Sequence, residues 1–198
     1  MQDDKREEGL RYFNLSQDKK TILLVGGSQG ALGINKGVSA RLASFKDNDY
    51  QLIWQTGNHY YDKALSEVDE NGLGDRIKCT VFIDRMDLAY AAADVVISRA
   101  GAMSISELSL LNKAVVFVPL PTAAEDHQTK NAMSLVNADA ALLVKNSETE
   151  NVLLPTVFDL LKNVDKQNEM KNNIAKFARP NAAEDIVDQI EIILKLNK

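Results

Sequence analysis

The chain has 198 residues, of which 45% are hydrophobic, and this is enough to form one sizeable core and predicts a single domain. A net charge of -5 and a pI near 5.1, with no cluster of lysines and arginines, argue against a nucleic-acid partner. The single cysteine rules out an internal disulfide, and the two distant histidines give no metal-site spacing. There is no signal-peptide pattern and no apolar run near the ~18 residues of a membrane span, so we expect a cytoplasmic domain with at most peripheral membrane contact.

Apolar strand-like runs alternate with amphipathic stretches, which is the sequence pattern of a doubly wound parallel α/β sheet, Rossmann-like in its layers. The charged residues 1–16 predict a short helix outside the sheet, at a domain junction, and residues 17–198 form the α/β domain. The predicted strands are Thr21–Val25, Gln51–Gln55, Ile77–Phe82, Val95–Ser98, Ala114–Val118 and Ala141–Val144. The predicted helices are Gly30–Phe45, Tyr60–Glu70, Met86–Ala93, Ala102–Leu111, Gln128–Asn137, Thr149–Leu161, Lys166–Phe177 and Ala182–Leu196.

The first predicted strand runs into a glycine-rich turn, Gly26–Ala31, which contains the hydroxyl of Ser28. The turn departs from Gly-x-Gly-x-x-Gly, it lacks the lysine of a P-loop, and no acid follows at the dinucleotide spacing. A dinucleotide or ATP site is therefore disfavoured. Alone, the segment is more typical of an ordinary strand-to-helix turn than of a binding site, and Ser28 could cap the helix there. A cap is compatible with a phosphate contact.

The strand Val95–Ser98 leads into a small-residue turn and a helix that carries one acid, Glu107. Gly101 lets the backbone come close to a ligand, so the amides of Ala102–Ser104 should face outward at the positive end of the helix, where an anion is expected. Glu107 follows Met103 by one helical turn, about 6 Å along the axis, an offset that fits a ribose diol. This layout predicts a nucleoside diphosphate site.

Two residues of this segment also have structural interpretations. Glu107 is compatible with a solvated acid on a helix surface. Arg99 is compatible with an ion pair to Asp84 or Asp94 as well as with a ligand contact.

A third segment, Pro119–Ala132, follows the strand Ala114–Val118 and gathers polar donors and acceptors at a helix start. Such a cluster suits the hydroxyls of a sugar. His127 lies within it and by its chemistry invites a general-base interpretation.

Four motifs, in this order, resemble the MurG family of bacterial glycosyltransferases: Gly26–Ala31, Phe82–Met86, Arg99–Glu107 and Glu125–Ala132. The resemblance implies a GT-B enzyme whose N-terminal half binds the lipid acceptor and holds the catalytic base, while the present half binds UDP-N-acetylglucosamine. No catalytic residue is then expected in this chain, and His127 is not a base. The residues implied to bind the donor are Gly27, Ser28, Ile83, Ala102, Met103, Ser104, Glu107, His127 and Gln128, with Gln29, Phe82, Arg99 and Asn131 in a second tier.

The resemblance also implies individual roles. The backbone at Phe82 and Ile83 would contact the uracil ring, although both side chains are compatible with a pure core role. His127 and Gln128 align with the pair that holds the sugar hydroxyls, and His127 departs from the glutamine that many members carry. Asn131 would bind the sugar or cap its own loop.

The implied reaction is an inverting transfer of N-acetylglucosamine to lipid I, which forms lipid II in peptidoglycan synthesis at the inner face of the cell membrane. Amides of Ala102–Ser104, assisted by Ser28, would stabilise the leaving diphosphate, so we expect neither a metal nor another cofactor. The chain alone should bind donor without turnover. The alternatives are the donor-binding subunit of a split transferase, a nucleotide-sugar sensor, and an epimerase-like module in which Glu125, Asp126 and His127 would supply acid and base.

Overall fold

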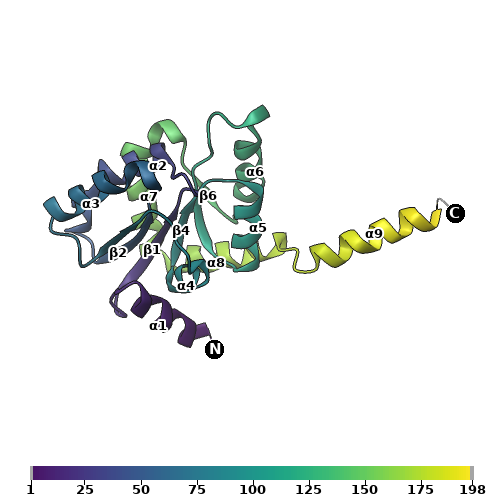
Figure 1. The fold of residues 1–198 in the computed structure, drawn as a ribbon, viewed down its shortest axis with the longest axis horizontal. Helices are drawn as coiled ribbons and strands as arrows, with labels where there is room; N and C mark the ends of the chain where they lie inside the picture. The colour runs from purple at the N-terminus through teal and green to yellow at the C-terminus, as the bar shows by residue number, and fades with distance from the viewer. Residues whose placement is uncertain (1, 197–198) are drawn as a thin grey trace.

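The computed structural model describes residues 2–196, and a six-stranded parallel sheet in the order β3-β2-β1-β4-β5-β6 forms its centre (Figure 1). Helices cover both faces of this sheet, as the doubly wound pattern predicts. The strands are β1 (Lys20–Val25), β2 (Tyr50–Gln55), β3 (Ile77–Thr80), β4 (Val95–Ser98), β5 (Ala114–Phe117) and β6 (Leu142–Leu143).

All six predicted strands coincide with observed ones, but three of them are shorter than expected, and one of these, β5, ends at Phe117, one residue before the predicted Val118. The strand predicted to reach Phe82 ends at Thr80, because the Thr80 hydroxyl donates to the Phe82 carbonyl at 2.6 Å and turns the chain out of the sheet. Phe82 therefore belongs to the β3–α4 loop. At the far edge, β6 pairs with β5 only through Leu142 and Leu143.

The helices follow the predicted positions, with two corrections. The helices are α1 (Gln2–Tyr12), α2 (Leu32–Ser39), α3 (Tyr61–Glu70), α4 (Met86–Ala92), α5 (Ala102–Leu110), α6 (His127–Val136), α7 (Leu154–Lys162), α8 (Val164–Ile174) and α9 (Ala182–Leu196). The prediction of one helix over Gly30–Phe45 is wrong, because Gly30 has φ 78° and a separate 3-10 turn follows α2 at Leu42–Phe45. The single helix predicted over Thr149–Leu161 is instead a π-helical segment, Thr149–Leu153, followed by α7.

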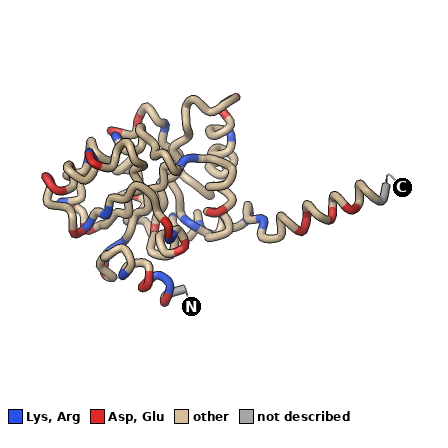
Figure 2. The backbone as a smooth tube through the Cα atoms, viewed as in Figure 1, with Lys and Arg blue, Asp and Glu red and all other residues tan. Residues whose placement is uncertain are grey.

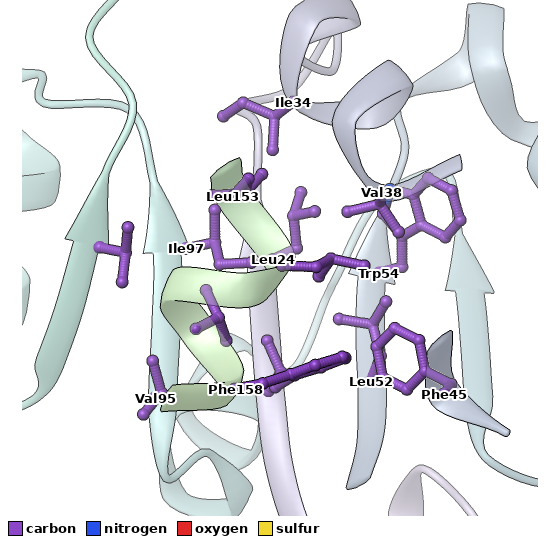
Figure 3. Packing of buried hydrophobic residues seen from close by; sticks show 14 of the residues in the cluster. Leu24, Ile34, Val38, Phe45, Leu52, Trp54, Val95, Ile97, Leu153 and Phe158 are labelled. Atoms are coloured by element: carbon purple, nitrogen blue, oxygen red, sulfur yellow. The ribbon is translucent and has the colours of Figure 1, made fainter. Parts of the chain in front are cut away.

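The core lies in two layers because successive strand residues point to opposite faces. On one face, β1, β2 and β4 contribute Leu24, Trp54 and Ile97, which pack under α2 and α7 (Figure 3). The intervening residues, including Leu23, join the second cluster on the opposite face. Trp54 is fully buried and its indole nitrogen donates to Asn35 Oδ1 at 2.9 Å, so it serves packing. This rigid two-sided sheet fixes where the strand ends lie.

The first helix, α1, lies outside the sheet and packs along α4. Arg6 donates to the Ala92 carbonyl at 2.6 Å and to Asp94 Oδ2 at 3.0 Å. The same Asp94 oxygen accepts the backbone N–H of Thr21 at 2.7 Å. The pair therefore ties α1 to the amino-terminal end of the sheet, while the role of residues 1–16 as a domain junction stays a prediction.

The last helix, α9, projects away from the body in Figure 1, after the predicted break at residues 179–181. Residues 182–194 are all exposed. Figure 2 shows acidic and basic residues interspersed along the chain. Among residues 2–196, no helix combines the length and the apolar character that crossing a membrane requires.

Candidate functional site

The candidate site lies where the order of the sheet reverses, between β1 and β4. In open α/β sheets a crevice forms beyond the carboxyl ends of the strands at this switch point. The turns that follow β1 and β4 contain the two glycine motifs, and a cavity of about 750 Å³ opens between them. Its lining includes Gly26, Gly27, Gly30, Lys36, Arg99, Gly101, Ser104, Leu120, Pro121, Thr122, Gln128, Asn146, Ser147, Thr149 and Glu150.

The turn after β1 is held in place by a close contact with the loop after β2. Gly30 and Gly57 both have positive φ, 78° and 73°. A Cβ on Gly30 would lie 2.0 Å from the Thr56 carbonyl oxygen, so only glycine lets the two backbones approach this closely. The amide of Gln55 also donates to the Gly27 carbonyl at 2.8 Å. The turn is thus rigidly supported.

The tip of this turn is free to meet a ligand. Ser28 and Gln29 are both exposed. Helix α2 begins after Ala31, and its N-terminus forms no side-chain capping bond. The interpretation of Ser28 as a helix cap is therefore wrong. Its hydroxyl stays a predicted phosphate contact.

The turn after β4 ends in the expected helix start. Gly101 is the N-cap of α5, and no side chain satisfies the first amides of that helix. Because the first turn of a helix has no intrahelical acceptors for its N–H groups, the amides of Ala102, Met103 and Ser104 remain available. Met103 is 78% exposed and Ser104 lines the cavity. These free amides are the groups predicted to bind an anion, and that contact stays a prediction.

Glu107 lies further along α5 with its side chain exposed. The hydroxyl of Tyr90, on α4, donates to Glu107 Oε2 at 3.0 Å. Tyr90 itself is buried, with 7% of its surface exposed, and this burial raises the pKa of its phenol, with the Glu107 carboxylate raising it further. Glu107 is therefore a positioned acid, in contrast to a freely solvated one.

Arg99 connects three parts of the cavity wall. Its Nη1 donates to the carbonyls of Val118 and Pro119, at 2.9 and 3.0 Å, and to Asn146 Oδ1 at 2.9 Å. Burial lowers the pKa of its guanidinium. It pairs with neither of the aspartates considered from the sequence, and Asp94 pairs with Arg6.

The third motif brings its glutamine, and not its histidine, to the cavity. Gln128 Oε1 accepts the N–H of Leu120 at 3.0 Å, which leaves its amide nitrogen to donate elsewhere. Asn131 donates to the Ala100 carbonyl at 3.3 Å, so it joins α6 to the β4–α5 turn and does not cap its own loop. His127 is exposed, with Nε2 3.9 Å from Glu125 Oε2, and is absent from the cavity lining.

Phe82 and Ile83 line a different, smaller cavity of about 290 Å³, which lies between β3 and the end of α1. Ile83 is buried in the core, whereas Phe82 is 52% exposed. The structure therefore does not bring these two residues into the larger cavity. Their predicted backbone contacts to a base remain predictions.

Sequence reasoning missed the wall of the cavity opposite the motifs. Residues 146–150 follow β6, and Thr149 donates from its hydroxyl to the Gly33 carbonyl at 2.8 Å. Lys36, which was also missed, lines the cavity together with residues 120–122 of the third predicted segment. The polar run Asn146-Ser147, shortly after the end of β6, is a weak signal that was available. Within the described part of the chain, no three His, Cys, Asp or Glu side chains gather into a potential metal site.

Comparison with known protein families assigns the chain to one of them. Residues 21–186 match the model of the glycosyltransferase family 28 C-terminal domain. The chain belongs to this family. This family 28 domain is 47% identical over 192 residues to "UDP-N-acetylglucosamine--N-acetylmuramyl-(pentapeptide) pyrophosphoryl-undecaprenol N-acetylglucosamine transferase" of Christiangramia forsetii, and 50% identical over 190 residues to the same-named protein of Bacteroides thetaiotaomicron. The alignments cover 97% and 94% of the chain but 51% of each relative, so the chain spans about half their length.

Solved structures agree with this assignment of the fold. The crystal structure of Acinetobacter baumannii MurG matches 96% of the chain and 52% of its own length, with a TM-score of 0.78 and 31% identity. The C-terminal CMP-Kdo binding domain of WaaA from the same species covers 87% of the chain and 95% of its own length, with a TM-score of 0.63 and 10% identity, which shows the fold alone. The predicted Rossmann-like, C-terminal GT-B architecture and the resemblance to the MurG family are confirmed.

Proposed function

We propose that this family 28 domain binds UDP-N-acetylglucosamine, as the donor half of the inverting transferase that adds N-acetylglucosamine to lipid I. One observation carries the proposal: the turn after β1 and the free N-terminus of α5 meet at one cavity at the switch point of the sheet. The printed name of the relatives, which cover nearly the whole chain at 47–50% identity, supplies the substrate class. Lipid I and peripheral contact with the inner face of the membrane belong to the remaining half of such an enzyme.

The proposed mechanism uses backbone amides for the diphosphate. The N-terminus of α5 carries a partial positive charge and faces the cavity through Ser104, so it suits the negative charge that develops on UDP as the sugar leaves. The hydroxyl of Ser28 would add one donor from the opposite turn. In this arrangement the diphosphate needs no metal.

The hexose would lie toward the third motif. Gln128 lines the cavity, and its carbonyl oxygen is already occupied by Leu120, so its NH₂ group is directed by that bond and can donate to a ring hydroxyl. His127 stays a weaker proposal, because its side chain is exposed outside the lining. The acceptor hydroxyl and its base would come from the other half of the enzyme.

The test of this proposal is a calorimetric titration of the 198-residue chain with UDP, UDP-N-acetylglucosamine, UDP-glucose and GDP. UDP and UDP-N-acetylglucosamine should bind, and incubation should release no free UDP. Absence of UDP binding would refute a donor site. Formation of free UDP or of the 2-epimer would favour an epimerase-like module over a donor half.

A first prediction concerns metal. We expect the Kd for UDP to be the same, within error, in excess EDTA and in millimolar Mg²⁺, because amides at a helix start carry the diphosphate. Parallel titrations in the two buffers at equal ionic strength make the comparison. A strict requirement for Mg²⁺ would overturn the amide mechanism.

A second prediction separates the sugar from the nucleotide. Gln128→Ala should weaken UDP-N-acetylglucosamine by about 1 kcal/mol, the net contribution of one neutral hydrogen bond, and should leave UDP nearly unchanged. His127→Ala is the matched neighbour and should have a smaller effect on both ligands. If Gln128→Ala weakens UDP and the UDP-sugar equally, the residue supports the loop at Leu120 and does not read the sugar.

A further inference from the structure

Tyr90 and Glu107 form a polar pair between two neighbouring helices. Tyr90 on α4 is 7% exposed, and its hydroxyl lies 3.0 Å from Glu107 Oε2. Glu107 is exposed, and within residues 2–196 its second oxygen, Oε1, has no described hydrogen-bond partner. Tyr90 therefore holds Oε2 of this exposed carboxylate, while Oε1 is left to bind a ligand.

The arrangement restricts the glutamate before any ligand binds. An exposed glutamate side chain has several rotatable bonds, and a ligand that orders them loses part of its binding free energy to this ordering. Tyr90 is itself held by packing in the core cluster beneath α5, so the hydroxyl it offers is fixed in space. A tyrosine phenol is already protonated at neutral pH, and burial raises the pKa of Tyr90 further, so its hydroxyl is a hydrogen-bond donor.

We propose that Tyr90 is a positioning residue for nucleotide binding: its hydroxyl orients the Glu107 carboxylate toward the two hydroxyls of a ribose. Oε1 accepts one hydroxyl, and the second lone pair of Oε2 accepts the other. This inference rests on the proposed function, because it needs a ribose at Glu107. It assigns Tyr90 no contact with the ligand.

The test uses Tyr90→Phe, which removes one oxygen and keeps the ring in the core. The matched control is Tyr60→Phe, because Tyr60 is equally buried, at 6%, and its hydroxyl also has one side-chain partner, Ser39 at 3.0 Å. Each variant is titrated with UDP and with 2′,3′-dideoxy-UDP, which lacks both ribose hydroxyls. Thermal unfolding of both variants reports the structural cost of each lost bond.

Tyr90→Phe should weaken UDP about fivefold, which corresponds to the loss of one hydrogen bond, and should leave dideoxy-UDP unchanged. Tyr60→Phe should change neither affinity, even where it lowers the unfolding temperature as much. In the Glu107→Ala background, Tyr90→Phe should have no further effect on UDP. If Tyr90 were only structural, the effect of Tyr90→Phe on UDP affinity would depend neither on Glu107 nor on the ribose hydroxyls.

Three outcomes would overturn the inference, and they are distinguishable from failure of the proposed function. If the unmodified chain binds UDP and Tyr90→Phe binds it equally well, Tyr90 does not position Glu107. If Tyr90→Phe weakens UDP and dideoxy-UDP alike, its effect is structural. If Tyr90→Phe weakens UDP as strongly with alanine at residue 107 as with glutamate, it acts independently of the carboxylate. Failure of the proposed function is a different result, in which the unmodified chain does not bind UDP.

Discussion

Replacing Glu107 with alanine should weaken UDP binding by about 1.5–3 kcal/mol, roughly 10- to 150-fold in Kd. A carboxylate that accepts two ribose hydroxyls forms charge-assisted bonds, which are stronger than neutral ones. Glu107 lies on α5 one turn beyond the free amides, so in the proposed complex it would lie beside the diphosphate without competing for it. Calorimetric titration of the two proteins with UDP measures the difference.

The matched control is Glu125→Ala, which removes the same charge at an exposed position next to α6. Loss of a negative charge should slightly favour an anionic ligand in both variants, so a general electrostatic effect cannot produce the expected weakening. Glu125→Ala should therefore bind UDP as tightly as the unmodified chain or slightly better. Equal affinities for Glu107→Ala and the unmodified chain would refute the ribose assignment.

The largest effect on stability is expected from Gly30→Ala, at about 2–5 kcal/mol of the free energy of unfolding. About 1–2 kcal/mol comes from forcing a side chain into the left-handed region, since Gly30 has φ 78°. A further ~1–3 kcal/mol comes from the clash of the new Cβ with the Thr56 carbonyl oxygen, 2.0 Å away, which only a backbone shift relieves. Urea unfolding followed by circular dichroism measures the change.

Gly72→Ala separates the two contributions. Gly72 has φ 66°, and a Cβ there would meet nothing within 4 Å. Only the conformational cost of about 1–2 kcal/mol should remain. If the two alanine variants lose equal stability, the contact between the loops after β1 and β2 does not stabilise the fold. Because that contact shapes the Gly26–Gly30 turn, Gly30→Ala should also weaken UDP in the folded fraction, whereas Gly72→Ala should not.

The sheet was predictable because its strands are short runs of apolar, often β-branched residues, and such runs have few other uses in a chain of this composition. Helix ends were less predictable. The start of α2 depends on Gly30, whose positive φ follows from a tertiary contact with Thr56 that local sequence does not encode. The π-helical segment Thr149–Leu153 likewise packs on α2, where Thr149 bonds to the Gly33 carbonyl.

The candidate site likewise contains residues that local sequence predicts and residues that it does not. The motif positions Ser104 and Gln128 line the cavity, as expected from strand–turn–helix patterns that place them at the sheet edge. Ser28 is exposed in the turn after β1 but is absent from the cavity lining, and its phosphate contact stays a prediction. The hydrogen bond from Tyr90 to Glu107 was not predicted, because an aromatic residue at helical spacing is most often part of the core. Asn146 lines the cavity and accepts a hydrogen bond from Arg99, but it was missed because residues so far apart in the sequence meet only after the chain has folded.

The projecting helix α9 affects how these affinities can be measured. Its side chains Ile186, Ile190 and Ile193 are each at least half exposed and recur at the spacing of one helical face. Exposed aliphatic residues at this spacing favour self-association, whose extent would rise with protein concentration. The Kd for UDP should therefore be measured both at tens of micromolar chain and at a tenth of that concentration. If the two Kd values agree, self-association does not affect binding. If they differ, light scattering at both concentrations detects dimerisation, and the variant Ile190→Asp serves as a monomeric reference.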